Sequence, residues 1–201
     1  MTEQATPRGY FERILAIDTE TSGLFMGQDT PVKNEKGEYY QVVSWGLMVL
    51  DQASLEIIEE LYIEQKWDGK SKWDVRAEAV HGLSKEYLEA NGVSREEAQV
   101  QIASLILKYW GKTSVVTLGH NSIRFDLPFL EHEAQLAGID LRFGNRHIDT
   151  NTLGCILFGT FNSDDLFEQL GFTKREEHNS LEDIRMTVKA ARIARKMVGL
   201  V

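Results

Sequence analysis

Residues 14–23 read Ile-Leu-Ala-Ile-Asp-Thr-Glu-Thr-Ser-Gly, an apolar run followed by two carboxylates and a turn signal. A short apolar run of this kind predicts a buried strand. Because strand side chains alternate between two faces, Asp18 and Glu20 point to one face and Thr19 to the other. Two neighbouring carboxylates at the end of a buried strand repel each other and lose hydration, which is costly unless a cation lies between them. Oxygen ligands favour Mg²⁺ or Mn²⁺ as that cation.

The composition is that of a globular protein with an excess of acidic residues. Of 201 residues, 42% are apolar and 26% are charged, and the formal net charge is −9. A chain this acidic is unsuited to coating duplex DNA, which depends on dense Lys and Arg. The single cysteine, Cys155, excludes an internal disulfide and a cysteine-only zinc site. With no visible secretory signal and no apolar run long enough to cross a bilayer, we expect a cytoplasmic protein with no membrane partner.

The pattern of elements favours one mixed α/β domain at residues 11–201, preceded by a flexible tail at 1–10. Three strands come first, and helices then alternate with short strands, which indicates a sheet covered by helices. A long loop or exposed hairpin is expected at 25–40, and it either overhangs the strand end or decorates the surface. The expected elements are strands at 11–18, 41–50 and 55–65, helices at 78–89 and 94–110, a strand at 114–118, a helix at 126–136, a strand at 147–149, and helices at 151–158, 164–170 and 180–197.

Three segments concentrate ionisable side chains near the ends of these elements, and each also has an ordinary structural interpretation. Asp126 is a candidate cap of the helix that follows it, since an Asp side chain accepts backbone N–H bonds at a helix start. Asp183 could complete a capping box with Ser180, but a box of Asn179 with Glu182 is equally good and leaves Asp183 outside the cap. His178 could be a simple helix-entry histidine. Asp18 with Glu20 is the hardest pair to explain structurally.

Taken together, the segments resemble the motifs of the DEDDh (DnaQ-like) 3′→5′ exonucleases. The first motif, Asp-x-Glu, is present at 17–24, the second at 119–130 and the third, His-x₄-Asp, at 178–183. Asp-x-Glu alone is a weak signal, whereas three motifs in this order on suitable elements are a strong one. The resemblance extends over about residues 11–195. It implies a ribonuclease-H-like fold with a mixed five-stranded sheet flanked by helices.

The resemblance also implies roles for five residues. Four carboxylates would bind two Mg²⁺ or Mn²⁺ ions, and they are Asp18, Glu20, Asp126 and Asp183. His178 would be the general base, a task suited to a pKa near neutrality. On an ideal helix a five-residue offset turns roughly 140°, so His178 and Asp183 would not share a face. We therefore expect His178 to lie in a loop just before the last helix.

The same resemblance implies how a substrate would bind. The segment after Asp-x-Glu would contact the 3′-terminal nucleotide through Thr21, Gly23 and Leu24, and Asn121 and Phe125 would contribute from the second motif. We expect a 3′→5′ exonuclease that removes 5′-mononucleotides from single-stranded ends, with DNA favoured over RNA. The alternatives are an RNA exonuclease similar to oligoribonuclease or ribonuclease T, and a catalytically silent module that docks on a polymerase. A polymerase or another replication or repair protein is accordingly a possible partner.

One further segment, residues 67–73, interleaves tryptophans with lysines. This is a weak nucleic-acid signature, and a solvated loop with two packed tryptophans is the alternative.

Overall fold

The computed structural model describes residues 12–24, 38–111, 113–141, 143–173 and 178–200. The expected tail at 1–10 and most of the expected loop at 25–40 lie outside these residues. Among the helices described, none combines the length and the apolar character needed to cross a bilayer.

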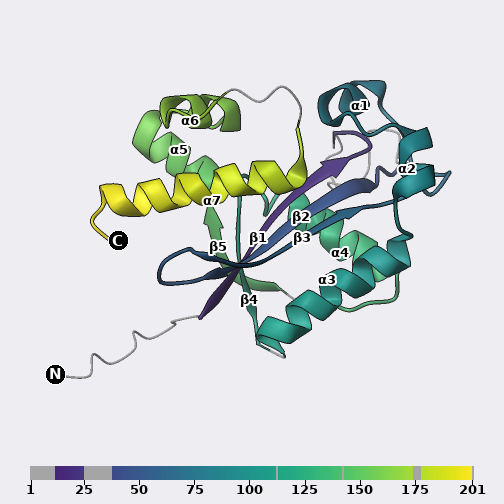
Figure 1. The fold of residues 1–201 in the computed structure, drawn as a ribbon, viewed down its shortest axis with the longest axis horizontal. Coiled ribbons are helices and arrows are strands. Elements are labelled where there is room, and N and C mark those ends of the chain that lie inside the picture. The colour runs from purple at the N-terminus through teal and green to yellow at the C-terminus, as the bar shows by residue number, and fades with distance from the viewer. Residues whose placement is uncertain (1–11, 25–37, 112, 142, 174–177, 201) are drawn as a thin grey trace.

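A five-stranded mixed sheet forms the centre of the molecule, as the sequence predicted (Figure 1). The strand order is β3-β2-β1-β4-β5. The first three strands pair antiparallel, and β4 and β5 run parallel to β1. The carboxyl ends of β1, β4 and β5 therefore lie at one edge of the sheet. The strands are β1 (Arg13–Thr21), β2 (Val42–Asp51), β3 (Ile57–Glu64), β4 (Val115–Gly119) and β5 (Phe143–Asp149).

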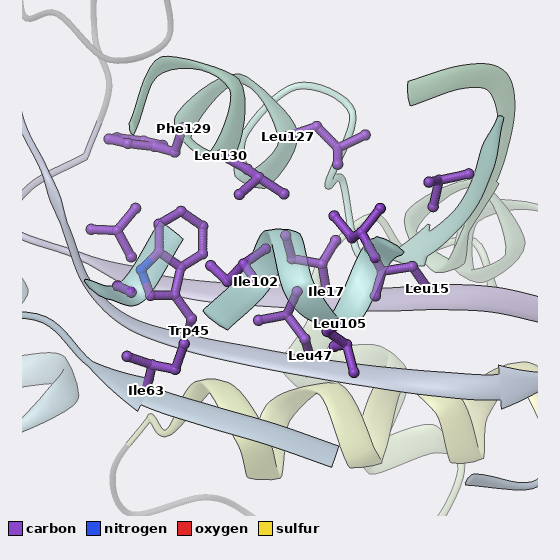
Figure 2. Close-up of a cluster of buried hydrophobic side chains, with 14 of the residues drawn as sticks. Leu15, Ile17, Trp45, Leu47, Ile63, Ile102, Leu105, Leu127, Phe129 and Leu130 are labelled. Atoms are coloured by element: carbon purple, nitrogen blue, oxygen red, sulfur yellow. The ribbon is translucent and has the colours of Figure 1, made fainter. Parts of the chain in front are cut away.

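Helices cover both faces of the sheet, because successive apolar side chains of β1 and β2 point to opposite faces and both faces need to be buried. On one face, Leu15 and Ile17 pack with side chains of α3 and α4 around Trp45 (Figure 2). On the other face, Ile14 and Ala16 pack against α7. The helices are α1 (Val75–His81), α2 (Lys85–Asn91), α3 (Arg95–Trp110), α4 (Asp126–Leu136), α5 (Thr150–Phe158), α6 (Ser163–Gln169) and α7 (Ser180–Met197).

The expected single helix at 78–89 is wrong, because two helices occupy this region. Gly82 ends α1 in the left-handed conformation, with φ of 70°, which glycine adopts at little cost. The hydroxyl of Ser84 then caps α2 by accepting the backbone N–H of Tyr87 at 3.1 Å. A stop signal and a start signal lie two residues apart, and the helical periodicity of the flanking residues obscures them.

The two tryptophans of segment 67–73 are packed, which favours the structural alternative for this loop. The ring centroids of Trp67 and Trp73 lie 6.3 Å apart in an edge-on arrangement. The ammonium of Lys85 lies 4.0 Å from the centre of the Trp67 ring, a cation–π contact. These rings therefore bind the loop to the start of α2.

Candidate active site

All five residues predicted to act in catalysis line one cavity of about 480 Å³ at the carboxyl ends of the parallel strands. Asp18 and Glu20 come from β1, Asp126 from the first turn of α4, His178 from the segment just before α7, and Asp183 from the first turn of α7. Asp18 and Glu20 share the face of β1 that carries Ile14 and Ala16, which is the face covered by α7. Strand alternation thus directs both carboxylates toward Asp183.

Three of these side chains form a group that fits a divalent cation. Ligand atoms of Glu20, His178 and Asp183 all lie within 4.8 Å of one another. Nδ1 of His178 is 3.1 Å from Oδ2 of Asp183. Carboxylate oxygens are the ligands that Mg²⁺ and Mn²⁺ prefer, and Asp18 and Asp126 add two more carboxylates to the same cavity. The donor set therefore suits the expected cations.

His178 lies in the segment before α7, where the helical offset predicted it. Its backbone N–H donates to the carbonyl of Val80 at the end of α1, at 3.0 Å. The cap of α7 is Asn179, whose side chain accepts the N–H groups of Leu181 and Glu182 at 3.1 and 3.2 Å. The side chain of Asp183 is therefore outside the cap and faces His178.

Asp126 is buried, with 3% of its surface exposed, and it does not cap α4. Phe125 occupies the cap position without a side-chain bond, so the capping interpretation of Asp126 is wrong. Instead the hydroxyl of Thr19 donates to Oδ1 of Asp126 at 2.7 Å. Burial raises the pKa of Asp126 to about 7, the bond from Thr19 opposes this shift, and the charge of Asp149 adds to it.

Thr19 is a site residue that the sequence analysis did not assign. It points away from Asp18 and Glu20, toward the face of the sheet that α4 covers, and so it reaches Asp126. Thr19, the middle residue of Asp-x-Glu, thereby links β1, which carries Asp18 and Glu20, to Asp126 in α4. The alternation of β1 predicted the direction of Thr19, but its partner is 107 residues away in the sequence.

Asp149 is a second unassigned residue, and it supports the turn that leads to Asp126. One carboxylate oxygen, Oδ1, accepts the backbone N–H of Asn121 at 2.8 Å and that of Asn151 at 2.9 Å. Asn121 has a φ of 59°, in the left-handed region that few residues other than Gly, Asn and Asp adopt. Asp149 therefore fixes a turn with an unusual backbone immediately before α4.

The predicted substrate-binding residues divide into two groups. Leu24, Asn121 and Phe125 line the cavity, and Leu24 is 66% exposed. Thr21 and Gly23 are not among the lining residues. The hydroxyl of Thr21 donates to the carbonyl of Gly23 at 2.9 Å, and a Cβ on Gly23 would lie 2.1 Å from the ring of Tyr40. Both residues have a structural role in the turn, and their contact with substrate stays a prediction.

Gly46 of β2 lets α7 approach the sheet closely. It pairs with Asp18 in the β1–β2 register. A Cβ on Gly46 would lie 2.2 Å from the backbone oxygen of Ser180, in the first turn of α7. A glycine within an apolar strand signals such a close approach of two backbones, but the sequence alone does not identify the second backbone.

Comparisons with known proteins identify the family and the fold. The model of the family RNase_T, described as exonuclease, matches residues 15–191. No curated protein is matched by sequence. E. coli exonuclease I in complex with a dT13 oligonucleotide has a TM-score of 0.75 and 16% identity, with 92% of this chain and 41% of that chain covered.

Two related structures give similar values. The zinc-bound form of the E. coli exonuclease I complex with single-stranded DNA has a TM-score of 0.74 and 16% identity, covering 92% of this chain and 41% of the other. A product-bound exonuclease I has a TM-score of 0.73 and 16% identity, covering 94% and 45%. The chain thus spans less than half the length of these proteins. At this identity the likeness shows a shared fold.

Proposed function

We propose that this chain, which belongs to the RNase_T exonuclease family, is a divalent-metal-dependent 3′→5′ exonuclease that releases 5′-mononucleotides from single-stranded DNA. The observation that carries the proposal is the meeting of Asp18, Glu20, Asp126, His178 and Asp183 in one cavity. These residues come from three distant segments of the chain. Buried or crowded carboxylates are costly unless a cation balances them, so their convergence supports a metal site.

Asp18, Glu20, Asp126 and Asp183 would hold two Mg²⁺ or Mn²⁺ ions, whose formal charge four carboxylates balance. Such ions neutralise the charge of a reacting phosphate and favour ionisation of water. Among the residues of the chain, Thr19 orients Asp126 through its hydrogen bond, and Asn179 keeps the side chain of Asp183 out of the helix cap. The protein therefore positions Asp126 and Asp183 before a substrate binds.

His178 is the proposed general base. Its Nδ1 faces Oδ2 of Asp183 at 3.1 Å. A proton on Nδ1, donated to this carboxylate, leaves Nε2 unprotonated and able to accept a proton from the attacking water. The backbone bond from His178 to Val80 fixes the start of this segment relative to α1.

Single-stranded DNA is the preferred substrate class in this proposal. Support comes from the fold shared with E. coli exonuclease I, whose structures hold single-stranded oligonucleotides. The net charge of −9 is consistent with a short contact around the reacting end rather than a long basic groove. An RNA exonuclease resembling oligoribonuclease or ribonuclease T is the second candidate, since the same cavity and metals suit either sugar.

The test uses matched DNA and RNA single strands that carry a 5′ label. With Mg²⁺ or Mn²⁺ we expect progressive shortening of the labelled DNA, slower shortening of the RNA, and no reaction in EDTA. Asp18→Asn, which removes one proposed ligand charge at nearly constant volume, is the inactive control. Immediate release of the label as a mononucleotide would reverse the polarity. A chain that shortens neither strand with either metal would instead be the silent, polymerase-docking module.

A further inference from the structure

The loop between α5 and α6 presents an aromatic side chain to the cavity. Phe161 lies in this loop, its surface is 64% exposed, and it lines the same cavity as the acidic residues. An exposed phenylalanine gives up the hydrophobic stabilisation that burial would provide. Other phenylalanines nearby do not share this exposure, since Phe167 of α6 is 3% exposed. Phe161 therefore presents an accessible aromatic ring at the wall of the cavity.

The backbone of Phe161 is held firmly although its side chain is exposed. Its carbonyl oxygen accepts a hydrogen bond from Nδ2 of Asn151 at 2.7 Å and lies 3.1 Å from Nε2 of His120, a geometry in which Nε2–H donates. The following residue, Asn162, caps α6 through its side chain. An aromatic ring on a fixed backbone loses little conformational entropy when it binds a ligand.

The two anchors of Phe161 belong to the structure that positions the acids. His120 precedes Asn121 in the turn that leads to α4, and Asn151 shares the carboxylate oxygen of Asp149 with Asn121. Phe161 is thus connected to the turn that precedes Asp126 directly through His120 and indirectly through Asn151 and Asp149. The backbone that carries the ring therefore has a defined position relative to that turn.

Phe161 and Leu24 border the cavity from segments that follow different strands of the sheet. Leu24 follows β1, whereas Phe161 follows α5, which begins where β5 ends, and β4 lies between β1 and β5. Figure 1 shows α5 and α6 on the side of the sheet away from α1 and α2. Asp18 of β1 and Asp126 of the first turn of α4 line the cavity together with these two apolar side chains. An extended strand bound over the acids would therefore meet an apolar group at each end.

We propose that Phe161 stacks on an unpaired base upstream of the scissile phosphate, with the 3′-terminal nucleotide placed toward Leu24. This inference rests on the proposed exonuclease function. Stacking on an aromatic ring tolerates every base, because each base has a π-face. It also supplies affinity that the acidic surface does not supply through charge. A paired base cannot stack in this way, so Phe161 is a specificity-determining residue that favours single-stranded ends.

The first experiment compares an oligonucleotide with a substrate that has no upstream base. The oligonucleotide is a thymidine 12-mer, and the second substrate is the methyl ester of thymidine 5′-monophosphate, whose leaving group has no ring to stack. We expect Phe161→Ala to lower kcat/KM for the 12-mer about 5- to 150-fold more than for the ester, the factor that one stacked base is worth. Phe161→Trp should restore most of the loss. The matched control is Ile156→Ala, which removes a 73% exposed apolar side chain of α5 that does not line the cavity.

The second experiment locates the stacked base with single abasic nucleotides placed along the 12-mer. For the wild-type chain, one abasic position upstream of the terminal nucleotide should reproduce the loss caused by Phe161→Ala. The variant should lose nothing more at that position, because the two changes remove the same contact. A merely structural role of Phe161 would give equal losses on both substrates and at all abasic positions, and this result would overturn the inference.

The failure of this inference differs from a failure of the proposed function. If the wild-type chain cleaves neither substrate, binding of a fluorescent 12-mer is measured by anisotropy with Ca²⁺, for the same variants. A 5- to 150-fold weaker binding of Phe161→Ala, restored by Phe161→Trp, would support stacking even in a silent module. Binding that is unchanged in Phe161→Ala, or absent in the wild-type chain, would overturn it.

Discussion

Substitution of Gly46 by alanine tests whether the approach of α7 to the sheet sets the geometry of the active site. The Cβ of alanine would lie 2.2 Å from the carbonyl oxygen of Ser180, and contacts of real Cβ atoms are rarely below 3.4 Å. The obstacle is backbone at the start of a helix, so it cannot rotate away. Relief therefore requires the first turn of α7 to move away from β2 by about 1 Å.

That movement would affect the site directly. The first turn of α7 carries Asp183, and Asp18 lies opposite Gly46 on β1. The hydrogen bond between the hydroxyls of Ser44 and Ser180, now 2.9 Å long, would lengthen as well. We expect a loss of about 1–3 kcal/mol in the free energy of unfolding from overpacking. Misplacement of reacting groups by about 1 Å should lower kcat about 10²-fold.

Urea unfolding followed by circular dichroism measures the first effect, and degradation of a single-stranded oligonucleotide measures the second. Mn²⁺ titration by calorimetry reports on the metal site without turnover and should show weaker binding. Gly144→Ala in β5 is the matched control, because its Cβ would lie 3.2 Å from the Cβ of Ser114 and 3.3 Å from the carbonyl oxygen of Val115, contacts that a shift of a few tenths of an ångström relieves. If Gly46→Ala kept the wild-type kcat and Mn²⁺ affinity, the close approach of β2 and α7 would not set the site geometry.

Three other substitutions test separate parts of the structure. His178→Ala should slow hydrolysis about 10²–10⁴-fold while Mn²⁺ binding by calorimetry stays nearly constant; an equal loss of Mn²⁺ affinity would make His178 a ligand. Asp126 has a folded pKa of about 7, above the ordinary 3.8, so in the metal-free chain its contribution to stability is present below about pH 4 and is lost as pH rises through 7. The difference between the folded and ordinary pKa corresponds to about 4 kcal/mol in the free energy of unfolding. Urea unfolding from pH 4 to 8 should show a smaller pH dependence of stability in Asp126→Asn than in the wild-type chain. Identical pH profiles would contradict the raised pKa. Arg95 pairs with the buried Glu133 at 2.5 Å, so Arg95→Ala should cost about 3–5 kcal/mol at pH 8 and less at pH 5, where Glu133 can take up a proton. Equal costs at both pH values would show that Glu133 is not the cause.

Short sequence patterns predicted those parts of the fold that depend on residues close together in the sequence. The apolar alternation of β1 predicted which way Asp18, Thr19 and Glu20 point. The helical offset between His178 and Asp183 predicted that His178 precedes α7. The prediction failed between α1 and α2, where Gly82 and Ser84 end one helix and begin the next within a continuous helical periodicity.

Distant pairs could not be predicted in this way. Thr19 and Asp126 are 107 residues apart, and their bond exists only because α4 packs on the face of β1 to which Thr19 points. Likewise Asp149 meets Asn121 because β5 lies beside β4. The family motifs identified Asp126 and Asp183 as expected metal ligands, but the motifs did not predict which side chains position them.

The sequence by itself thus determined the alternation of the strands, the position of His178 before the last helix and the identity of the acidic residues, because these depend on spacings of a few residues. Only the tertiary structure decided that Phe161 borders the cavity and that Gly46 meets Ser180. Such contacts depend on the order of strands in the sheet and on which face each helix covers. Those choices are set by the packing of the whole core, to which every buried side chain contributes.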